Sequence, residues 1–378
     1  MQVEALQSIN EIAAADWNRL VEPGYPFLRH EFFLALEQSG AVSEQTGWRV
    51  THLLVSEQNQ TLAILPLFCK THSMGEYVFD QQWAQAYYYH GLDYYPKLLT
   101  AIPFTPSQGQ RLLIKPGSDC RAILACLLQY IKELAGQAGY SSWHCLFPDT
   151  PQLDLFAAEG LIVRQGVQFH WFNQAYRDFE DFLQTLTASK RKMLRRERRL
   201  VAEQGIELVR IAGPAISEEQ WRAFFRFYNS TYRKNGAQAY LNQTFFQQIA
   251  ANMAERIVLI LAVKENRYIA AALSFVGADC LYGRYWGCDR EYPMLHFETC
   301  YYQGLEYCME NNLQRFDSGA QGEHKIARGF EPVPTYSVHW LKDKRFAKSI
   351  ADFVAREQQA VSLYQDEAAS YLPFKTQN

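Results

Sequence analysis

Two stretches of the chain show the same pattern of apolar and polar positions. Apolar residues dominate 53–55 and 61–68, with a short polar turn between them. The same features recur in the second half of the chain, where Val263 takes the place of Val55. Apolar runs separated by a short polar turn are typical of paired strands. Each stretch therefore predicts a β-hairpin.

Helical patterns surround both hairpins. Leu28–Phe33 and Leu241–Phe246 each begin a segment whose apolar residues recur at helical spacing. Each hairpin is followed by another helical segment and then a short strand, at 121–138 and 142–147 in the first copy and at 296–312 and 314–317 in the second. The same order of elements thus occurs twice, which indicates an internal duplication.

The duplication predicts an α/β (α+β) protein of two tandem domains, each with a mixed, mostly antiparallel sheet flanked by helices. We expect the first domain at 1–168, with a tyrosine-rich insertion at 83–115, and the second domain at 169–342. Helical spacing after residue 343 predicts one more helix, so 343–378 is expected to form a C-terminal helix and tail packed across the second domain.

Composition narrows the class of protein. The 378 residues suffice for about two domains with cores of their own. The net charge of −3 argues against general binding of nucleic acid, so any polyanion would need a local basic patch. The eight cysteines include no C-x-x-C pair, and no metal site is predicted. Without a signal-like start or an apolar run of about 18 residues, we expect a cytoplasmic protein with no membrane span.

The densest polar chemistry lies at 319–330, directly after the last predicted strand of the second domain. Within six residues this loop contains Glu323, His324, Lys325 and Arg328, and glycines flank them. Loops at the carboxyl ends of strands often contain active sites. A surface turn with solvated charges is the structural alternative, but such turns seldom combine an acid, an imidazole and two cations.

A basic run at 190–199 has seven cations in ten residues. Its apolar positions predict a helix with a cationic outer face. Lys190 and Arg191 would then lie in the first turn, where the helix dipole disfavours positive charge, so a bound phosphate or RNA backbone would offset the cost. With Arg195 they are the candidate anion contacts. A solvated helix face, paired in part with Glu197 and Glu203, is the equal alternative.

A predicted strand at 280–288 places polar residues beside the loop. Strand alternation sends Arg284 and Trp286 to one face and Tyr285 to the other. An arginine in the middle of a strand is seldom buried without an anionic partner, so we expect one for Arg284. His296 begins the next helix, and for this histidine a structural role is favoured.

Five segments resemble motifs of the Fem-like N-acyltransferases, a FemAB-like or peptidoglycan biosynthesis/recognition branch of the GNAT acyltransferase superfamily. They lie at 90–98, 102–106, 190–199, 282–287 and 319–330, and the resemblance extends from about Pro26 to Trp340. It implies two GNAT-like domains side by side. It also implies transfer of an acyl or aminoacyl group to an amine acceptor, a small molecule or a peptide, in the groove between the domains.

The donor stays open between acyl-coenzyme A and aminoacyl-tRNA, used as a co-substrate and not as a permanently bound cofactor. An ordinary GNAT enzyme binds the coenzyme A pyrophosphate on a glycine-containing turn before its third helix. Here that place, 290–296, has no glycine, which weakens the coenzyme A alternative. A non-catalytic module that recognises peptidoglycan precursors or RNA is the alternative from another class.

Acyl transfer to an amine requires a base, stabilisation of the oxyanion and an acid for the leaving group. We expect Glu323 or His324 to be the base and Tyr285 or Tyr301 to be the acid. Further candidates for binding the donor or the substrate are Lys325, Arg328, Gln321 and Arg284. The resemblance adds Tyr94, Lys97 and Thr105 of the tyrosine-rich insertion as a substrate or interdomain wall.

Overall fold

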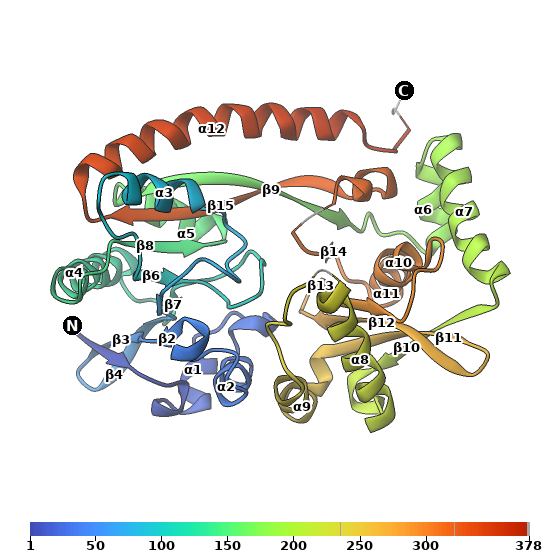
Figure 1. Cartoon of the computed structure of the whole chain (residues 1–378), viewed down its shortest axis with the longest axis horizontal. Helices are drawn as coiled ribbons and strands as arrows, with labels where there is room; N and C mark the ends of the chain where they lie inside the picture. The colour runs from blue at the N-terminus through green and yellow to red at the C-terminus, as the bar shows by residue number, and fades with distance from the viewer. Residues whose placement is uncertain (235, 321, 376–378) are drawn as a thin grey trace. The chain divides into compact units, whose positions relative to one another are not determined.

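The computed structural model describes residues 1–234, 236–320 and 322–375 and divides into two compact units (Figure 1). Unit 1 consists of Met1–Gly166 and Pro334–Leu363, and unit 2 consists of Val167–Val333 and the residues from Tyr364 onward. The chain passes between the units within three elements, which are β9 (Ile162–Phe172), β15 (Glu331–Leu341) and α12 (Lys344–Ser370).

The C-terminal helix forms, but its place differs from the prediction. We expected 343–378 to be separate from the first domain and to pack across the second. Instead α12 belongs to unit 1 as far as Leu363 and to unit 2 from Tyr364. The reason is the path of β15, which begins in unit 2 and returns the chain to unit 1 before the helix starts.

Unit 1 contains the first predicted hairpin, formed by β3 (His52–Glu57) and β4 (Gln60–Leu65). The second strand is shorter than the apolar run because Pro66 has no N–H to donate to a neighbouring strand. The chain then starts a new strand in a second sheet. The strand orders are β1-β3-β4-β7 and β15-β8-β6-β5-β2, with β1 (Gln2–Leu6), β2 (Trp48–Val50), β5 (Phe68–Lys70), β6 (Lys97–Thr100), β7 (Leu113–Ile114) and β8 (Ser142–Leu146).

The helices of unit 1 include the long helix expected at 121–138. They are α1 (Ala14–Asn18), α2 (His30–Gln38), α3 (Gln81–Tyr89), α4 (Cys120–Ala138) and α5 (Thr150–Ala158). The Asp119 side chain accepts hydrogen bonds from two N–H groups in the first turn of α4, and Gly139 ends this helix in a left-handed conformation. Leu127 of α4 and Trp143 of β8 lie in one buried cluster.

Unit 2 forms one run of strands in the order β10-β11-β12-β13-β14-β9. The strands are β10 (Ile206–Ala212), β11 (Ile257–Lys264), β12 (Arg267–Val276), β13 (Cys280–Cys288) and β14 (Arg315–Asp317), and the helices are α6 (Phe179–Thr185), α7 (Ala188–Glu203), α8 (Glu218–Lys234), α9 (Gln243–Asn252), α10 (Leu295–Phe297) and α11 (Gln303–Glu310). A π-helical turn, Glu298–Tyr302, joins α10 to α11.

A parallel strand pair occurs in each unit. In unit 1, β6 and β8 are parallel and α4 lies between them in the chain. In unit 2, β13 and β14 are parallel, with α10 and α11 between them. The other pairs of named strands described within either unit are antiparallel. The duplication predicted from the sequence therefore produces the same mixed, mostly antiparallel arrangement twice.

Unit 1 buries a neutral histidine whose titration provides a test of the packing. The His52 ring is fully buried, and its Nδ1 accepts a hydrogen bond from the Leu67 N–H at 3.0 Å. Burial lowers the pKa of His52 to about 3. Below pH 6.5 the unfolded chain therefore binds a proton that the folded protein does not, so this contribution to stability falls as the pH falls.

We expect the stability advantage of the wild type over His52→Gln to shrink by about 2 kcal/mol between pH 7 and pH 5. Urea unfolding of both proteins at the two pH values measures the difference. The comparison cancels the titration of groups that the two proteins share. An advantage that stays constant between pH 7 and pH 5 would contradict the neutral, buried state of His52.

Candidate functional site

The polar loop begins where β13 and β14 stop pairing. Their register covers Cys280–Tyr282 and Arg315–Asp317, after which β13 continues while the chain beyond β14 turns into the loop. A bulge opposite Leu273 and Ser274 makes Arg284 the extra residue of β13. Beyond Tyr282 and Asp317, the edge of β13 that faced β14 therefore has no parallel partner strand, and this edge lies next to the loop.

Arg284 has the anionic partner that its mid-strand position predicts. Its guanidinium donates to the two carboxylate oxygens of Asp317 at 3.1 and 2.7 Å, and both side chains are almost fully buried. Burial would raise the pKa of Asp317, but the Arg284 guanidinium holds that pKa well below its usual range. This pair fixes the start of the loop to β13.

Lys325 stabilises the loop through hydrogen bonds to its backbone. Its side chain is buried, and the ammonium donates to the carbonyl oxygens of Ser318 and Gly319 at 3.2 and 2.8 Å. Burial lowers the pKa of Lys325 to about 8. The structure therefore places this predicted donor-binding cation inside the loop, where it already satisfies two backbone carbonyls.

The residues from Glu323 to Arg328 form a 3₁₀ helix between two glycines with positive φ. Gly322 has φ +118°, and a Cβ there would lie 2.5 Å from the His324 ring. Consecutive side chains on a 3₁₀ helix point about 120° apart because there are three residues per turn. Glu323 and His324 therefore point in different directions.

His324 is the exposed imidazole of the loop, and Tyr301 is its partner. The Tyr301 hydroxyl lies 2.8 Å from His324 Nε2. The ring of His296 is 6.1 Å from the His324 ring, and the Trp286 ring is 5.4 Å from that of His296. Partial burial and the charges of Arg328 and Lys325 lower the pKa of His324, which is therefore neutral at pH 7.

Glu323 is turned toward the C-terminal helix. Its Oε1 accepts a hydrogen bond from the Tyr364 hydroxyl at 2.8 Å. Burial raises the pKa of Tyr364 to about 12, and the hydrogen bond to the Glu323 carboxylate adds to this increase. Of the two candidate bases, only His324 contacts Tyr301, one of the two candidate acids.

Arg328 belongs to a buried network centred on Glu197 of α7. Its Nη2 donates to both Glu197 carboxylate oxygens at 2.7 and 2.8 Å, and its Nε donates to the Tyr302 hydroxyl at 3.0 Å. The Tyr302 hydroxyl donates to Glu197 in turn. Arg328 Nη1 also donates to the His324 carbonyl oxygen at 2.6 Å. The predicted donor-binding role of Arg328 is thus replaced by an ion pair that holds the loop.

The π-helical turn supplies both tyrosines of the site. Tyr301 contacts His324, and Tyr302 contacts the Glu197–Arg328 pair. Single π-helical turns inside α-helices often occur at functional sites. The sequence predicts Glu197 only as a partner for the cations of its own helix. The spacing of Leu194, Glu197 and Val201 places all three on one helical face, and the structure buries that face. This spacing is the sequence signal that could have indicated a buried role for Glu197.

The basic run forms α7, as predicted. Arg195 pairs with Glu180 at 2.5 Å, and Arg191 donates to Gln184 Oε1 at 3.1 Å. Among the described residues, the cations of α7 that form no ion pair are Lys190, Arg191, Lys192 and Arg196. Of the predicted anion contacts, Lys190 and Arg191 thus form no ion pair in the described part of the chain, whereas Arg195 is already paired with Glu180.

Tyr285 lies away from the loop. Its ring packs against those of Tyr228, Phe246 and Phe275, on the face of the sheet that α8 and α9 cover. Trp286, the next residue, contacts His296 on the other face. The predicted alternation is therefore confirmed for this pair, but it separates Tyr285 from His324.

The three candidates in the tyrosine-rich insertion are buried in unit 1. Lys97 donates to Glu76 and Asp80 at 2.7 and 2.5 Å, and the Tyr94 hydroxyl donates to Asp80 at 2.6 Å. Thr105 donates to the Pro103 carbonyl oxygen at 3.1 Å. The predicted substrate wall is thus a buried polar cluster, because Glu76 and Asp80 neutralise Lys97.

The candidate Gln321 lies outside the described residues. Among those that the structure does describe, no group of three or more histidine, cysteine or acidic side chains could hold a metal ion. Within the same part of the chain, no helix combines the length and apolar character that crossing a membrane requires.

Antiparallel strands that lead to a parallel pair joined through a helix occur in both units, which defines a protein of two similar mixed α/β units. The chain belongs to the FemAB_like family, described as peptidoglycan biosynthesis/recognition, whose family model matches residues 8–376. A comparison of the sequence with curated proteins found no match.

The solved structures that resemble this chain are distant from it in sequence. FemX is 12% identical with a TM-score of 0.53, and the match covers 93% of this chain and 100% of FemX. A conserved protein of unknown function from Bacteroides thetaiotaomicron is 10% identical with a TM-score of 0.51, covering 89% and 99%. A tandem GNAT protein from the clavulanic acid biosynthesis pathway is 11% identical with a TM-score of 0.45, covering 90% and 98%.

Proposed function

We propose that the chain is an N-acyltransferase that transfers an acyl or aminoacyl group to an amine, and that the reaction occurs in unit 2 where β13 and β14 stop pairing. The observation that carries this proposal is the His324–Tyr301 pair at that point. The family description supports an amine of a peptidoglycan-precursor peptide as the acceptor.

The pair can move the protons that aminolysis requires. Neutral His324 removes a proton as the amine attacks the donor carbonyl and the new C–N bond forms. The donor C–O or C–S bond then breaks, and the leaving oxygen or sulfur takes a proton from Tyr301, which regains one from His324. Burial raises the pKa of Tyr301 above its usual value, so the hydroxyl stays protonated until the leaving group requires it. N–H groups on the β13 edge beyond Tyr282 can stabilise the oxyanion.

Aminoacyl-tRNA is the donor that we favour over acyl-coenzyme A. The segment between β13 and α10 contains no glycine, and Met294 occupies its left-handed position with φ +64°. A side chain at that position hinders the close approach of a pyrophosphate to the backbone. The outward cations of α7, a helix joined to the loop by Glu197, offer contacts for an RNA backbone instead.

A binding and turnover experiment separates the donors. The triple variant Lys190→Ala/Lys192→Ala/Arg196→Ala is expected to bind tRNA more weakly and to lower the slope of log Kd against log salt by about 2. Arg195→Ala is the matched control, because Arg195 is already paired with Glu180. Turnover with acyl-coenzyme A but not with aminoacyl-tRNA would show that acyl-coenzyme A is the donor. Tight binding without turnover of either donor would favour a recognition module.

A further inference from the structure

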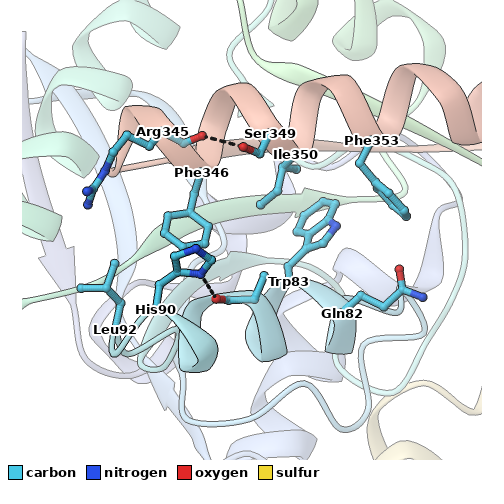
Figure 2. A pocket seen from close by; sticks show the side chains of 10 residues that line it. Gln82, Trp83, His90, Leu92, Arg345, Phe346, Ser349, Ile350 and Phe353 are labelled. Carbon is cyan, nitrogen blue, oxygen red and sulfur yellow. Dashed lines mark hydrogen bonds between the residues drawn. The ribbon is translucent and has the colours of Figure 1, made fainter.

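Helix α12 has separate anchors in the two units. In unit 1, Phe346, Ile350 and Phe353 point from this helix toward α3 and line a groove of about 530 Å³ (Figure 2). Arg164 of β9 donates to the two carboxylate oxygens of Glu357, each at 2.7 Å. The residues from 364 onward belong to unit 2 instead. We call 364–375, the last turns of α12 and the residues after it, the C-terminal strap.

The end of the strap pairs with the chain between α6 and α7. The Thr187 N–H donates to the Pro373 carbonyl oxygen at 2.8 Å, and the Lys375 N–H donates to the Thr185 carbonyl oxygen at 2.9 Å. These hydrogen bonds flank an antiparallel bridge at Phe374. The strap is therefore held by backbone pairing at the start of α7, the helix that also binds the polar loop.

Apolar side chains of the strap pack against the end of the loop. Ala368 is buried in the same apolar cluster as Ile326 and Phe330, and the Phe374 ring packs against this cluster. Gly329 follows the 3₁₀ helix with φ +86°, and a Cβ at this position would lie 3.4 Å from the Phe374 ring. The strap thus lies directly against the backbone where the loop ends, and these contacts fix its place in unit 2.

The beginning of the 3₁₀ helix is held differently from its end. At the end, Arg328 is bound to Glu197 of α7. At the beginning, the Tyr364 hydroxyl donates to Glu323 Oε1 at 2.8 Å. Among the described residues, the Glu323 carboxylate forms no other hydrogen bond and no ion pair. His324 follows Glu323 directly, so the strap holds the residue next to the candidate base.

We propose that Tyr364 is a positioning residue for acyl transfer, an inference that rests on the proposed role of His324 as the base. The hydrogen bond from Tyr364 to Glu323 fixes the first residue of the 3₁₀ helix, and this keeps the His324 ring beside the Tyr301 hydroxyl. Catalytic groups must be held within about 0.5 Å of their productive geometry. A loosened first turn would therefore slow the reaction while leaving substrate binding intact.

Hydrogen–deuterium exchange measures the positioning without turnover. The N–H groups of Lys325 and Gly329 donate to backbone carbonyl oxygens of the same helical segment at 3.0 Å each, so both amides report its opening. In Tyr364→Phe, which removes only the hydroxyl, we expect these amides to exchange about fivefold faster. Tyr371→Phe is the matched control, because this exposed tyrosine of the strap forms no hydrogen bond through its hydroxyl in the described part of the chain.

Steady-state kinetics measure the effect on the reaction. Tyr364→Phe should lower kcat by about fivefold and leave KM for the donor and the acceptor unchanged. Glu323→Ala should have the same effect, whereas Glu323→Gln should not, because the amide oxygen accepts the same hydrogen bond. The double variant Tyr364→Phe/Glu323→Ala should be no slower than either single variant, since both remove one interaction. Tyr364 is 36% exposed, so the urea midpoint of every variant should stay close to that of the wild type.

Equal exchange of the loop amides in Tyr364→Phe and Tyr371→Phe would overturn the inference. Additive losses of kcat in the double variant would also overturn it, and so would a rise in KM with kcat unchanged. Absence of turnover in the wild type would instead refute the proposed function, and the exchange rates would then decide whether the strap holds the loop. Failure of the proposed function and failure of this inference therefore give different results.

Discussion

Replacing Glu197 with alanine is expected to destabilise unit 2 by about 3–5 kcal/mol. The substitution leaves the Arg328 guanidinium buried without its carboxylate, while Tyr302 loses an acceptor. Urea unfolding measures the change. Glu180→Ala is the matched control on the exposed pair with Arg195, where a loss of about 0–1 kcal/mol is expected.

The double variant Glu197→Met/Arg328→Met tests whether the loss comes from an uncompensated charge. Removing both partners takes away the buried charge, so most of the stability should return. If Glu197→Ala costs no more than Glu180→Ala, the ion pair does not hold the loop, and the arrangement that places His324 beside Tyr301 needs another explanation.

The second large effect concerns turnover. His324→Asn is expected to lower the rate of acyl transfer by at least about a hundredfold, because asparagine keeps a polar side chain but cannot accept a proton from the attacking amine. Glu323→Gln should retain most of the activity, since Glu323 is turned toward Tyr364. Donor consumption with matched amounts of folded enzyme measures both variants. A loss confined to Glu323→Gln would reverse the assignment of the base.

Much of the fold could be predicted from the sequence because its signals are local. Apolar runs around a short polar turn marked the hairpins, helical spacing marked α4 at nearly its observed bounds, and the basic run marked the middle of α7. The polar loop could also be placed directly after the strand at 314–317, although that strand is not the last of the second copy, because β15 begins right after the loop. Patterns of this kind depend only on near neighbours in the chain.

Partnerships across the chain could not be predicted in the same way. Glu197 and Arg328 are 131 residues apart, and no periodicity links an acid in one helix to a cation in a distant loop. Lys97 is a candidate for a substrate wall only through the family resemblance, and no local pattern in the sequence links it to its buried partners, Glu76 and Asp80. The divergence of Glu323 and His324 follows from a 3₁₀ turn that their sequence alone did not specify.

The pH dependence of acyl transfer by the wild type and His324→Asn tests the central claim most directly. The account predicts that the wild-type rate rises with pH through a pKa below 6.5, the direction in which burial and the nearby cations move His324. This limb should be absent from the slow residual reaction of the variant. An acid limb of unchanged position in His324→Asn would contradict the role of His324 as the base.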